Sequence, residues 1–198
     1  IVEVMGRDSG YLAMSSGIAS AANAVLFREA GKSEAAVVEQ IADVVLSAKK
    51  KPKNRSRRVL VIKAEGVEIP SDRLKSLVDA RLAADPRSGD EPPETRVAVL
   101  GHIVRGGRPS AQDRILGSRL AHVAVRALLA GKSGLMAAWG PWAGSDPAAG
   151  ERAEADPHCW LVPISTVLEE TTKLLDGRSE RARWRKRLFE DISDVLAL

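Results

Sequence analysis

The sequence contains a single cysteine, Cys159, and this scarcity excludes a disulfide bond within the chain. The three histidines, His102, His122 and His158, do not stand with Cys159 at a spacing typical of a metal site. No constellation that would activate a thiol surrounds Cys159, so we expect it to be inert. A shortage of cysteine is typical of proteins from a reducing compartment, and we expect a cytoplasmic protein.

The sequence also lacks a long apolar run. No stretch of ~18 apolar residues is present, which argues against a membrane-spanning helix. No charged-then-apolar segment resembles a secretory leader. We therefore expect a soluble protein that has no membrane partner.

Basic residues exceed acidic ones only slightly, 30 against 26, for a net charge of +4. Much of the excess lies in Lys49-Lys-Lys-Pro-Lys-Asn-Arg-Ser-Arg-Arg58, a run that could bind nucleic-acid phosphates. No aromatic residue interrupts the run to stack on a base, so a solvated linker is the favoured interpretation. Nucleic-acid binding through this run and the Arg105–Arg108 turn stays a minor alternative.

Apolar runs of strand length alternate with segments of helical spacing along most of the chain. Residues 33–49 form the clearest predicted helix, because apolar residues from Val37 to Ala48 share one face. Ser110 and Asp113 have the spacing of a capping box, with Asp in place of the usual Glu or Gln, at the start of another predicted helix. This alternation predicts an α/β fold, a three-layer sandwich in which helices cover both faces of a parallel sheet. The pattern predicts strands at 1–5, 24–28, 58–63, 95–101 and 134–139, helices at 9–22, 33–49, 71–84, 110–130, 165–175 and 178–197, and loops at 85–94 and 140–157.

The two ends of the chain carry further signals. A strand pattern begins at Ile1 without an initiator methionine, and we expect that a preceding portion has been removed. In the last predicted helix, Trp184, Leu188, Ile192 and Val195 share one face, which we expect to dock on the body of the domain.

Polar residues follow the ends of three predicted strands. Met5-Gly6-Arg7 follows the first strand, Glu65-Gly66 the third, and His102 with Arg105 the fourth. Open parallel sheets bind ligands outside the carboxyl ends of their strands. Glycine permits close backbone approach, a helix amino end favours an anion, and an arginine adds a charge-assisted bond. The pattern indicates a site for a phosphorylated ligand.

Each of these features also has a purely structural interpretation, which the sequence leaves open. Residues 5–10 could form a plain tight turn with a surface arginine. Glu65 could cap its own turn or pair with a neighbouring arginine. His102 could be satisfied by backbone groups.

Arg96 stands apart from the other candidate residues. Six residues of strand, at ~3.3 Å each, separate it from His102 by ~20 Å. One small ligand cannot contact both side chains within one subunit. If both residues bind sugar phosphate, Arg96 must reach a neighbour's site and the protein must be an oligomer; otherwise Arg96 forms a rim salt bridge, for example with Glu94.

Several of these segments stand together in an order and at a spacing that identify a family. They are Val2-Glu-Val-Met-Gly-Arg7, Glu65-Gly66, Glu94-Thr-Arg96 and Leu100-Gly-His-Ile-Val-Arg-Gly-Gly107, followed by Pro109 and Asp113-Arg114. The ordered set resembles the 6-phosphofructokinase family, over roughly residues 1–139.

The resemblance implies a role for each residue that follows the first and third strands. Met5, Gly6 and Arg7 would contact fructose 6-phosphate. Arg7 would also act in catalysis, by steadying the phosphoryl group during its transfer. Glu65 would bind sugar hydroxyls.

The residues around the fourth strand have implied roles too. His102 and Arg105 would hold the sugar and its 6-phosphate. Arg96 would cross to the site of an adjacent subunit, which implies a homo-oligomer, a dimer or a tetramer. This agrees with the strand-length argument.

The resemblance also implies an organisation into functional lobes. Residues 1–103 would build the fructose 6-phosphate-binding lobe. Residues 104–145 would return to the nucleotide lobe, and residues 146–198 would form a loop and terminal helices that pack back on the body.

The chain departs from the family pattern in several places. The family's glycine-rich donor loop and its Thr-Ile-Asp-Asn-Asp segment, which carries the base and the metal-binding carboxylates, would lie upstream of Ile1, so the N-terminal half is missing. Mg²⁺ and the donor, ATP or pyrophosphate, would therefore bind outside this chain, and we expect the chain alone to be inactive. Val104 replaces a common glutamine. Asn23 replaces an acidic effector ligand of regulated bacterial members, which disfavours nucleotide regulation.

The sequence thus predicts the C-terminal, sugar-phosphate-binding portion of a 6-phosphofructokinase. When complete, this enzyme would transfer a phosphoryl group to the 1-hydroxyl of fructose 6-phosphate in glycolysis. A catalytically inactive sugar-phosphate sensor or regulatory subunit is the alternative, and a basic nucleic-acid-binding protein is less favoured.

Overall fold

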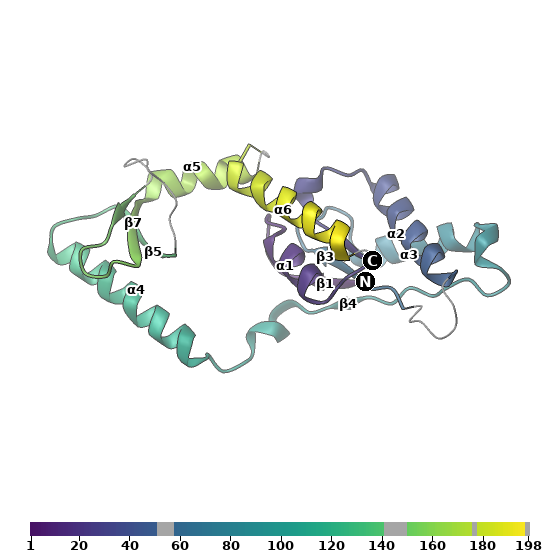
Figure 1. Cartoon of the computed structure of the whole chain (residues 1–198), viewed down its shortest axis with the longest axis horizontal. Helices are drawn as coiled ribbons and strands as arrows, with labels where there is room; N and C mark the ends of the chain where they lie inside the picture. The colour runs from purple at the N-terminus through teal and green to yellow at the C-terminus, as the bar shows by residue number, and fades with distance from the viewer. Residues whose placement is uncertain (51–57, 141–149, 176–177, 197–198) are drawn as a thin grey trace. The chain divides into compact units, whose positions relative to one another are not determined.

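The structure, a computed structural model, describes residues 1–50, 58–140, 150–175 and 178–196 (Figure 1). The chain divides into two compact units: unit 1 comprises Ile1–Arg105 with Gly177–Leu198, and unit 2 comprises Gly106–Asp176. The three functional lobes expected from the sequence stay a prediction.

Unit 1 is built on a four-stranded sheet, and every strand pairing in it is parallel. The strands lie in the order β2-β3-β1-β4, so consecutive strands are joined by crossovers. Glu3 pairs with Lys63 and with Val99, which aligns the carboxyl ends of three neighbouring strands. The predicted α/β class and parallel sheet are confirmed for this unit. The strands are β1 (Val2–Val4), β2 (Ala24–Leu26), β3 (Val61–Ala64) and β4 (Ala98–Val99).

Helices α2 (Glu34–Lys49) and α3 (Ser71–Ala83) cover one face of this sheet. Helix α2 begins as predicted, because the Ser33 hydroxyl accepts a hydrogen bond from the Ala36 amide at 3.3 Å. The apolar side chains of both helices pack against alternate residues of the strands. This cluster consists of Ala24, Leu26, Val37, Val38, Ile41, Ala42, Leu46, Val61, Ile69, Leu74, Val78 and Leu82.

Helices α1 (Tyr11–Ala19) and α6 (Glu180–Leu196) lie on the opposite face. Phe189 of α6 packs edge-on against Phe27, with ring centroids 5.6 Å apart. Helices on both faces are the arrangement predicted from the sequence. The buried cluster here consists of Ala13, Met14, Val25, Phe27, Ile62 and Ala64.

The docked face of α6 differs from the predicted one. Trp184 and Leu188 are exposed, so the prediction that their face packs on the body is wrong. Large apolar side chains occur on more than one side of this helix, so its periodicity alone could not identify the packed side. The side chain of Val195, also named in that prediction, lies outside the described residues.

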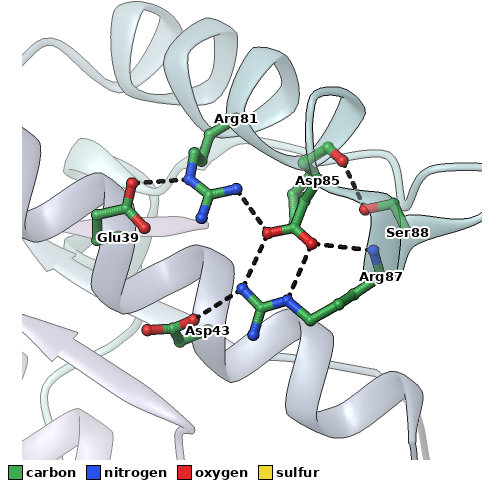
Figure 2. Close-up of polar contacts among 7 residues, drawn as sticks. Glu39, Asp43, Arg81, Asp85, Arg87 and Ser88 are labelled. Atoms are coloured by element: carbon green, nitrogen blue, oxygen red, sulfur yellow. Dashed lines mark hydrogen bonds and ion pairs between the residues drawn. The ribbon is translucent and has the colours of Figure 1, made fainter.

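An ion-pair network joins α2 to the end of α3 (Figure 2). The Asp85 carboxylate, which is buried, accepts two bonds of 2.9 Å from the Arg87 guanidinium and one of 2.7 Å from Arg81. Arg81 also binds Glu39 at 2.7 Å, and Arg87 binds Asp43 at 3.3 Å. The bonds from Arg87, then those from Arg81, hold the pKa of Asp85 far below its usual range.

Three strands of unit 1, β1, β2 and β4, end earlier than predicted. Strand β2 gives way to the short helix η1 (Arg28–Ala30), and β4 gives way to η3 (Gly101–Arg105). Gly101 has a φ of +49°, so the chain leaves the extended conformation there. In the predicted loop 85–94, the structure has a third such turn, η2 (Pro86–Ser88).

The basic run at 49–58 lies mostly outside the described residues, which omit 51–57. Lys49, at the end of α2, donates to the carbonyl oxygens of Ser88 and Glu91. Its ammonium group therefore binds backbone carbonyls within the fold.

Unit 2 begins with helix α4 (Ala111–Leu129), and its predicted capping box is confirmed. The Ser110 hydroxyl accepts from the Asp113 amide at 3.2 Å, and the Asp113 carboxylate accepts from the Ser110 amide at 2.8 Å. Helix α4 packs on the sheet of this unit through a small cluster. Its buried members are Val123, Ala127, Ala153, Cys159 and Leu161.

The sheet of unit 2 is antiparallel, so the prediction of a parallel sheet is wrong for this part of the chain. Strands β5 (Leu135–Trp139), β6 (Glu151–Arg152) and β7 (Cys159–Pro163) lie in the order β5-β7-β6. Strand β7 was not predicted, and β6 falls within the predicted loop at 140–157. Residues 141–149 of that loop lie outside the described residues.

Helix α5 (Ile164–Leu175) follows β7, one residue earlier than predicted. Within the described ranges, no helix is both long and apolar enough to cross a membrane.

Candidate functional site

The candidate residues, apart from Arg96, lie at one edge of the sheet of unit 1. Residues 5–7 directly follow β1, Glu65 follows β3, and His102 with Arg105 lie in η3 after β4. Because β3, β1 and β4 are parallel neighbours, their carboxyl ends meet at the same edge. This is the edge where open α/β sheets bind ligands.

Glu65 holds the turn that follows β1. Its Oε1 atom accepts a hydrogen bond of 2.9 Å from the Gly6 amide and another from the Arg7 amide. These bonds, from Arg7 and then Gly6, lower the pKa of Glu65, and the positive charge of Arg105 contributes further. The carboxylate is therefore ionised at neutral pH. The sequence left open that Glu65 caps its own turn, but in the structure it binds the amides of the turn after β1 instead.

The backbone around this turn leaves no room for additional side chains. Gly6 has a φ of +148°, and a Cβ there would lie 2.6 Å from the Ser9 carbonyl oxygen. A Cβ at Gly66 would collide with the Arg7 carbonyl oxygen. Arg7 itself has a φ of +50°, which is uncommon for a residue other than glycine. The turns after β1 and β3 therefore pack directly against each other.

The amino end of α1 is occupied by a carboxylate of the chain itself. The Gly10 amide donates to both oxygens of Glu29, at 2.9 and 3.1 Å. Nearby, Arg28 forms an ion pair of 3.2 Å with Asp8. The sequence suggested this helix end for a ligand's phosphate or sugar oxygen, but in the structure Glu29 of η1 binds there.

The side chains of η3 are open to solvent. His102 and Arg105 are both exposed, as are Ile103 and Val104. Arg105 lies close enough to Glu65 to act on its pKa. The imidazole and guanidinium groups are therefore accessible to a ligand at this edge.

Arg96 lies beyond the opposite edge of the sheet. It precedes β4, and its carbonyl oxygen accepts a bond of 2.7 Å from the amino terminus of Ile1. Its side chain is 88% exposed and lies 3.8 Å from Glu94. A pair this exposed and this long contributes little to stability. Arg96 thus precedes β4 and His102 follows it, although only Ala98 and Val99 between them form a strand.

The sequence reasoning missed a buried polar cluster on the face that α3 covers. Lys63, which is 2% exposed, pairs with Glu3 at 3.0 Å, and Ser71 donates to the same carboxylate oxygen at 2.5 Å. Burial raises the pKa of Glu3, but the Ser71 hydroxyl and Lys63 outweigh it, so the net shift is downward. Glu3 and Lys63 meet because they are paired across β1 and β3. The one signal in the sequence was that each short strand contains a charged residue.

Asn23 also has a structural role. Its side-chain oxygen accepts a hydrogen bond of 2.9 Å from the Leu60 amide. The bond ties the start of β2 to the chain before β3.

The described residues contain no group of three or more histidine, cysteine or acidic side chains that could hold a metal ion. We assign none of the described residues to a metal.

The geometry suits a phosphorylated, polyhydroxylated molecule. Arg7, His102 and Arg105 supply cationic or donor groups, and Glu65 supplies an acceptor. All four come from segments that follow strands of one rigid sheet.

Comparison with known proteins points in the same direction. Residues 1–128 match the family model described as Phosphofructokinase. An ATP-dependent 6-phosphofructokinase of Natranaerobius thermophilus is 39% identical over 136 residues, covering 69% of this chain and 37% of that protein. The corresponding protein of Bacillus thuringiensis is 37% identical over 134 residues, with 68% and 37% covered. The chain thus spans little more than a third of the length of these relatives.

The fold is similar to that of solved phosphofructokinases. The crystal structure of Pichia pastoris phosphofructokinase in the T-state aligns over 98% of this chain and 19% of that one. The TM-score is 0.62 and the sequence identity is 26%.

Proposed function

We propose, from the premise that this chain belongs to the phosphofructokinase family, that it supplies the sugar-phosphate site of a 6-phosphofructokinase. The observation that carries the proposal is the meeting of residues 5–7, Glu65, His102 and Arg105 at one sheet edge. In the complete enzyme, the phosphoryl group of the donor passes to the 1-hydroxyl of fructose 6-phosphate, which loses its proton to a base.

Arg105 and His102 bind the 6-phosphate and the sugar in this proposal. Both side chains are exposed at the site edge, and a guanidinium suits a phosphate. The positive charge of Arg105 also lies near enough to Glu65 to lower the pKa of its carboxyl group.

In this proposal the Glu65 carboxylate both holds the turn after β1 and binds the substrate. Both amides of the turn bind its Oε1 atom, and the proposal assigns Oε2 to the sugar hydroxyls. The same carboxylate thereby fixes the backbone of Met5, Gly6 and Arg7 against the substrate. Arg7 then steadies the transferring phosphoryl group.

Arg96 completes the site of a neighbouring subunit. It lies at the far edge of its own sheet, and its side chain is almost fully exposed. We therefore propose a homo-oligomer, a dimer or a tetramer, in which the Arg96 guanidinium binds substrate across the subunit boundary.

The donor and Mg²⁺ bind to parts of the enzyme other than the residues described here. Two of the similar proteins are named as ATP-dependent, which favours ATP over pyrophosphate. The chain alone is expected to bind the sugar phosphate without turnover, because phosphoryl transfer also requires a base and a metal ion.

Calorimetric titration with fructose 6-phosphate tests this function, with inorganic phosphate as the competing anion. Saturable binding that prefers the sugar phosphate is expected, and Arg105→Ala should weaken it by about tenfold or more. The exposed Arg187 of α6 provides a matched control, and Arg187→Gln should leave the affinity unchanged. Equal affinity for both anions, or no binding by the folded chain, would contradict the proposal.

A further inference from the structure

A cavity in unit 1 lies beside the carboxyl ends of β2 and β3. Its volume is about 730 Å³, within the usual range of small-molecule sites. It is lined by the segments that follow these strands and by the first turns of α2 and α3. None of the residues assigned to the sugar-phosphate site lines it.

One wall of this cavity is apolar. Val37 and Ile69 form it, and both belong to the buried cluster that α2 and α3 cover. Such a wall favours the uncharged body of a ligand over water. The apolar lining includes Val25, Phe27, Val37, Val67 and Ile69.

The rim of the cavity carries more positive than negative groups. Arg28, Lys32 and Arg73 line it, together with the carboxylates of Glu34 and Glu68. The first turns of α2 and α3 add partial positive charge. This combination favours a ligand with an anionic group.

Lys32 is the cation best placed to receive that group. Its ammonium donates a bond of 2.7 Å to the neutral side-chain oxygen of Gln40, and it forms no ion pair with a carboxylate of the described residues. Arg73 is instead held by Glu34 through bonds of 2.9 and 3.2 Å. Both side chains of that pair are open to solvent, so exchanging Glu34 for a ligand anion costs little.

We propose that this cavity binds a small organic anion with an apolar body. The phosphate or carboxylate group of the ligand binds Lys32 and Arg73, and its body packs on Val37 and Ile69. Arg28 connects this site to the turn that carries Arg7, because it also pairs with Asp8.

Phenyl phosphate is a suitable probe, because it joins an aromatic ring to a phosphate. Inorganic phosphate and phenol, tested separately, serve as controls for its anionic group and its aromatic ring. Calorimetry should show saturable binding of phenyl phosphate, with an affinity about tenfold or more above that of either half. Amide resonances of Phe27, Gly31 and Ile69 should shift at the same concentrations. Binding no tighter than that of inorganic phosphate would overturn the proposal.

Two variants distinguish this cavity from the sugar-phosphate site. Lys32→Glu should weaken phenyl phosphate by about tenfold and leave fructose 6-phosphate binding unchanged. Arg105→Ala should do the reverse, and Arg187→Gln should change neither. Loss of phenyl phosphate binding in Arg105→Ala, with Lys32→Glu unaffected, would place the probe in the sugar-phosphate site and overturn the inference. Because each ligand has its own variant, failure of one proposal leaves the other open to its own test.

Discussion

The two units of this chain bury their sheets in different ways. Unit 1 has a parallel sheet with a buried cluster on each face. Unit 2 has an antiparallel sheet on which α4 packs through one small cluster, and Val125, Leu128 and Leu129 of that helix are more than half exposed. A sheet covered on both faces positions the loops at its edge more firmly than a thinly covered one. The candidate site accordingly belongs to unit 1.

In both units, arginine side chains bind an aspartate that lies outside the helices and strands. In unit 1, Asp85 is bound by Arg81 and Arg87 (Figure 2). In unit 2, Asp156 accepts two bonds from Arg119, of 2.6 and 2.7 Å, which lower its pKa well below the usual range. Such pairs thus occur in both units, and the difference between the units lies in their apolar cores and in the buried Glu3–Lys63 pair of unit 1.

The largest effect is expected from breaking the buried ion pair of unit 1. Lys63→Ala leaves Glu3 without its cation and should cost about 3–5 kcal/mol of unfolding free energy. Hydrogen exchange of the β3 amides measures this loss. Lys75→Ala, which removes a half-exposed partner of Asp79, should have a much smaller effect. Equal effects of the two variants would contradict the importance given to burial.

Truncating a core side chain should destabilise only the unit that contains it. Leu74 is fully buried in unit 1, and Leu161 is 6% exposed in unit 2. Replacing either by Ala should cost about 2–5 kcal/mol. Amide exchange should accelerate only in the unit that carries the substitution. Acceleration throughout the chain by either variant would show that the two units unfold as one.

Removing the serine caps of α2 and α4 should reduce the stability of the two units by smaller amounts. Ser110→Ala removes one half of a reciprocal capping box, whereas Ser33→Ala removes a single cap. Each should cost about 0.5–2 kcal/mol, and Ser110→Ala should be the more damaging because its hydroxyl makes two bonds with Asp113. Chemical denaturation of both variants measures this order, and the reverse order would contradict it.

Mild acid should have the smallest effect. The folded-state pKa of Asp85 is depressed, so its stabilising contribution is complete above its unfolded value of about 4. The contribution is lost as the pH falls below that value. Melting temperatures should therefore change little between pH 7 and 5 and fall more steeply below pH 4. Asp85→Asn should flatten that fall, and an unchanged slope would contradict the assignment.

The sequence predicted unit 1 more accurately than unit 2, for physical reasons. Residues 33–49 carry both a cap and a regular apolar face, and the site residues stand directly after apolar strands. Strand β7 is a five-residue run, Cys159–Pro163, with no alternation to distinguish it. Its partners are set by tertiary pairing, which local patterns do not contain.

The sequence predicted the sheet edge at which the candidate residues meet, but only part of the contacts there. Glycines and charges at strand ends located the edge where Glu65 meets the turn at 6–7. The bond between Gly10 and Glu29 joins residues 19 apart and depends on where β2 ends. The Glu3–Lys63 pair depends on register. Both belong to the three-dimensional arrangement, so no spacing rule could have found them.

The most direct test of the central claim is an amide chemical-shift titration of this chain with fructose 6-phosphate. The account predicts that Gly6, Arg7, Gly66 and residues 101–105 shift together and saturate at one concentration. Amides of α4 in unit 2 should remain unchanged. Two results would contradict the assignment of the sugar-phosphate site to this edge. One is a set of shifts confined to unit 2, and the other is a spectrum that stays unchanged at a ligand concentration on the order of 1 mM or more.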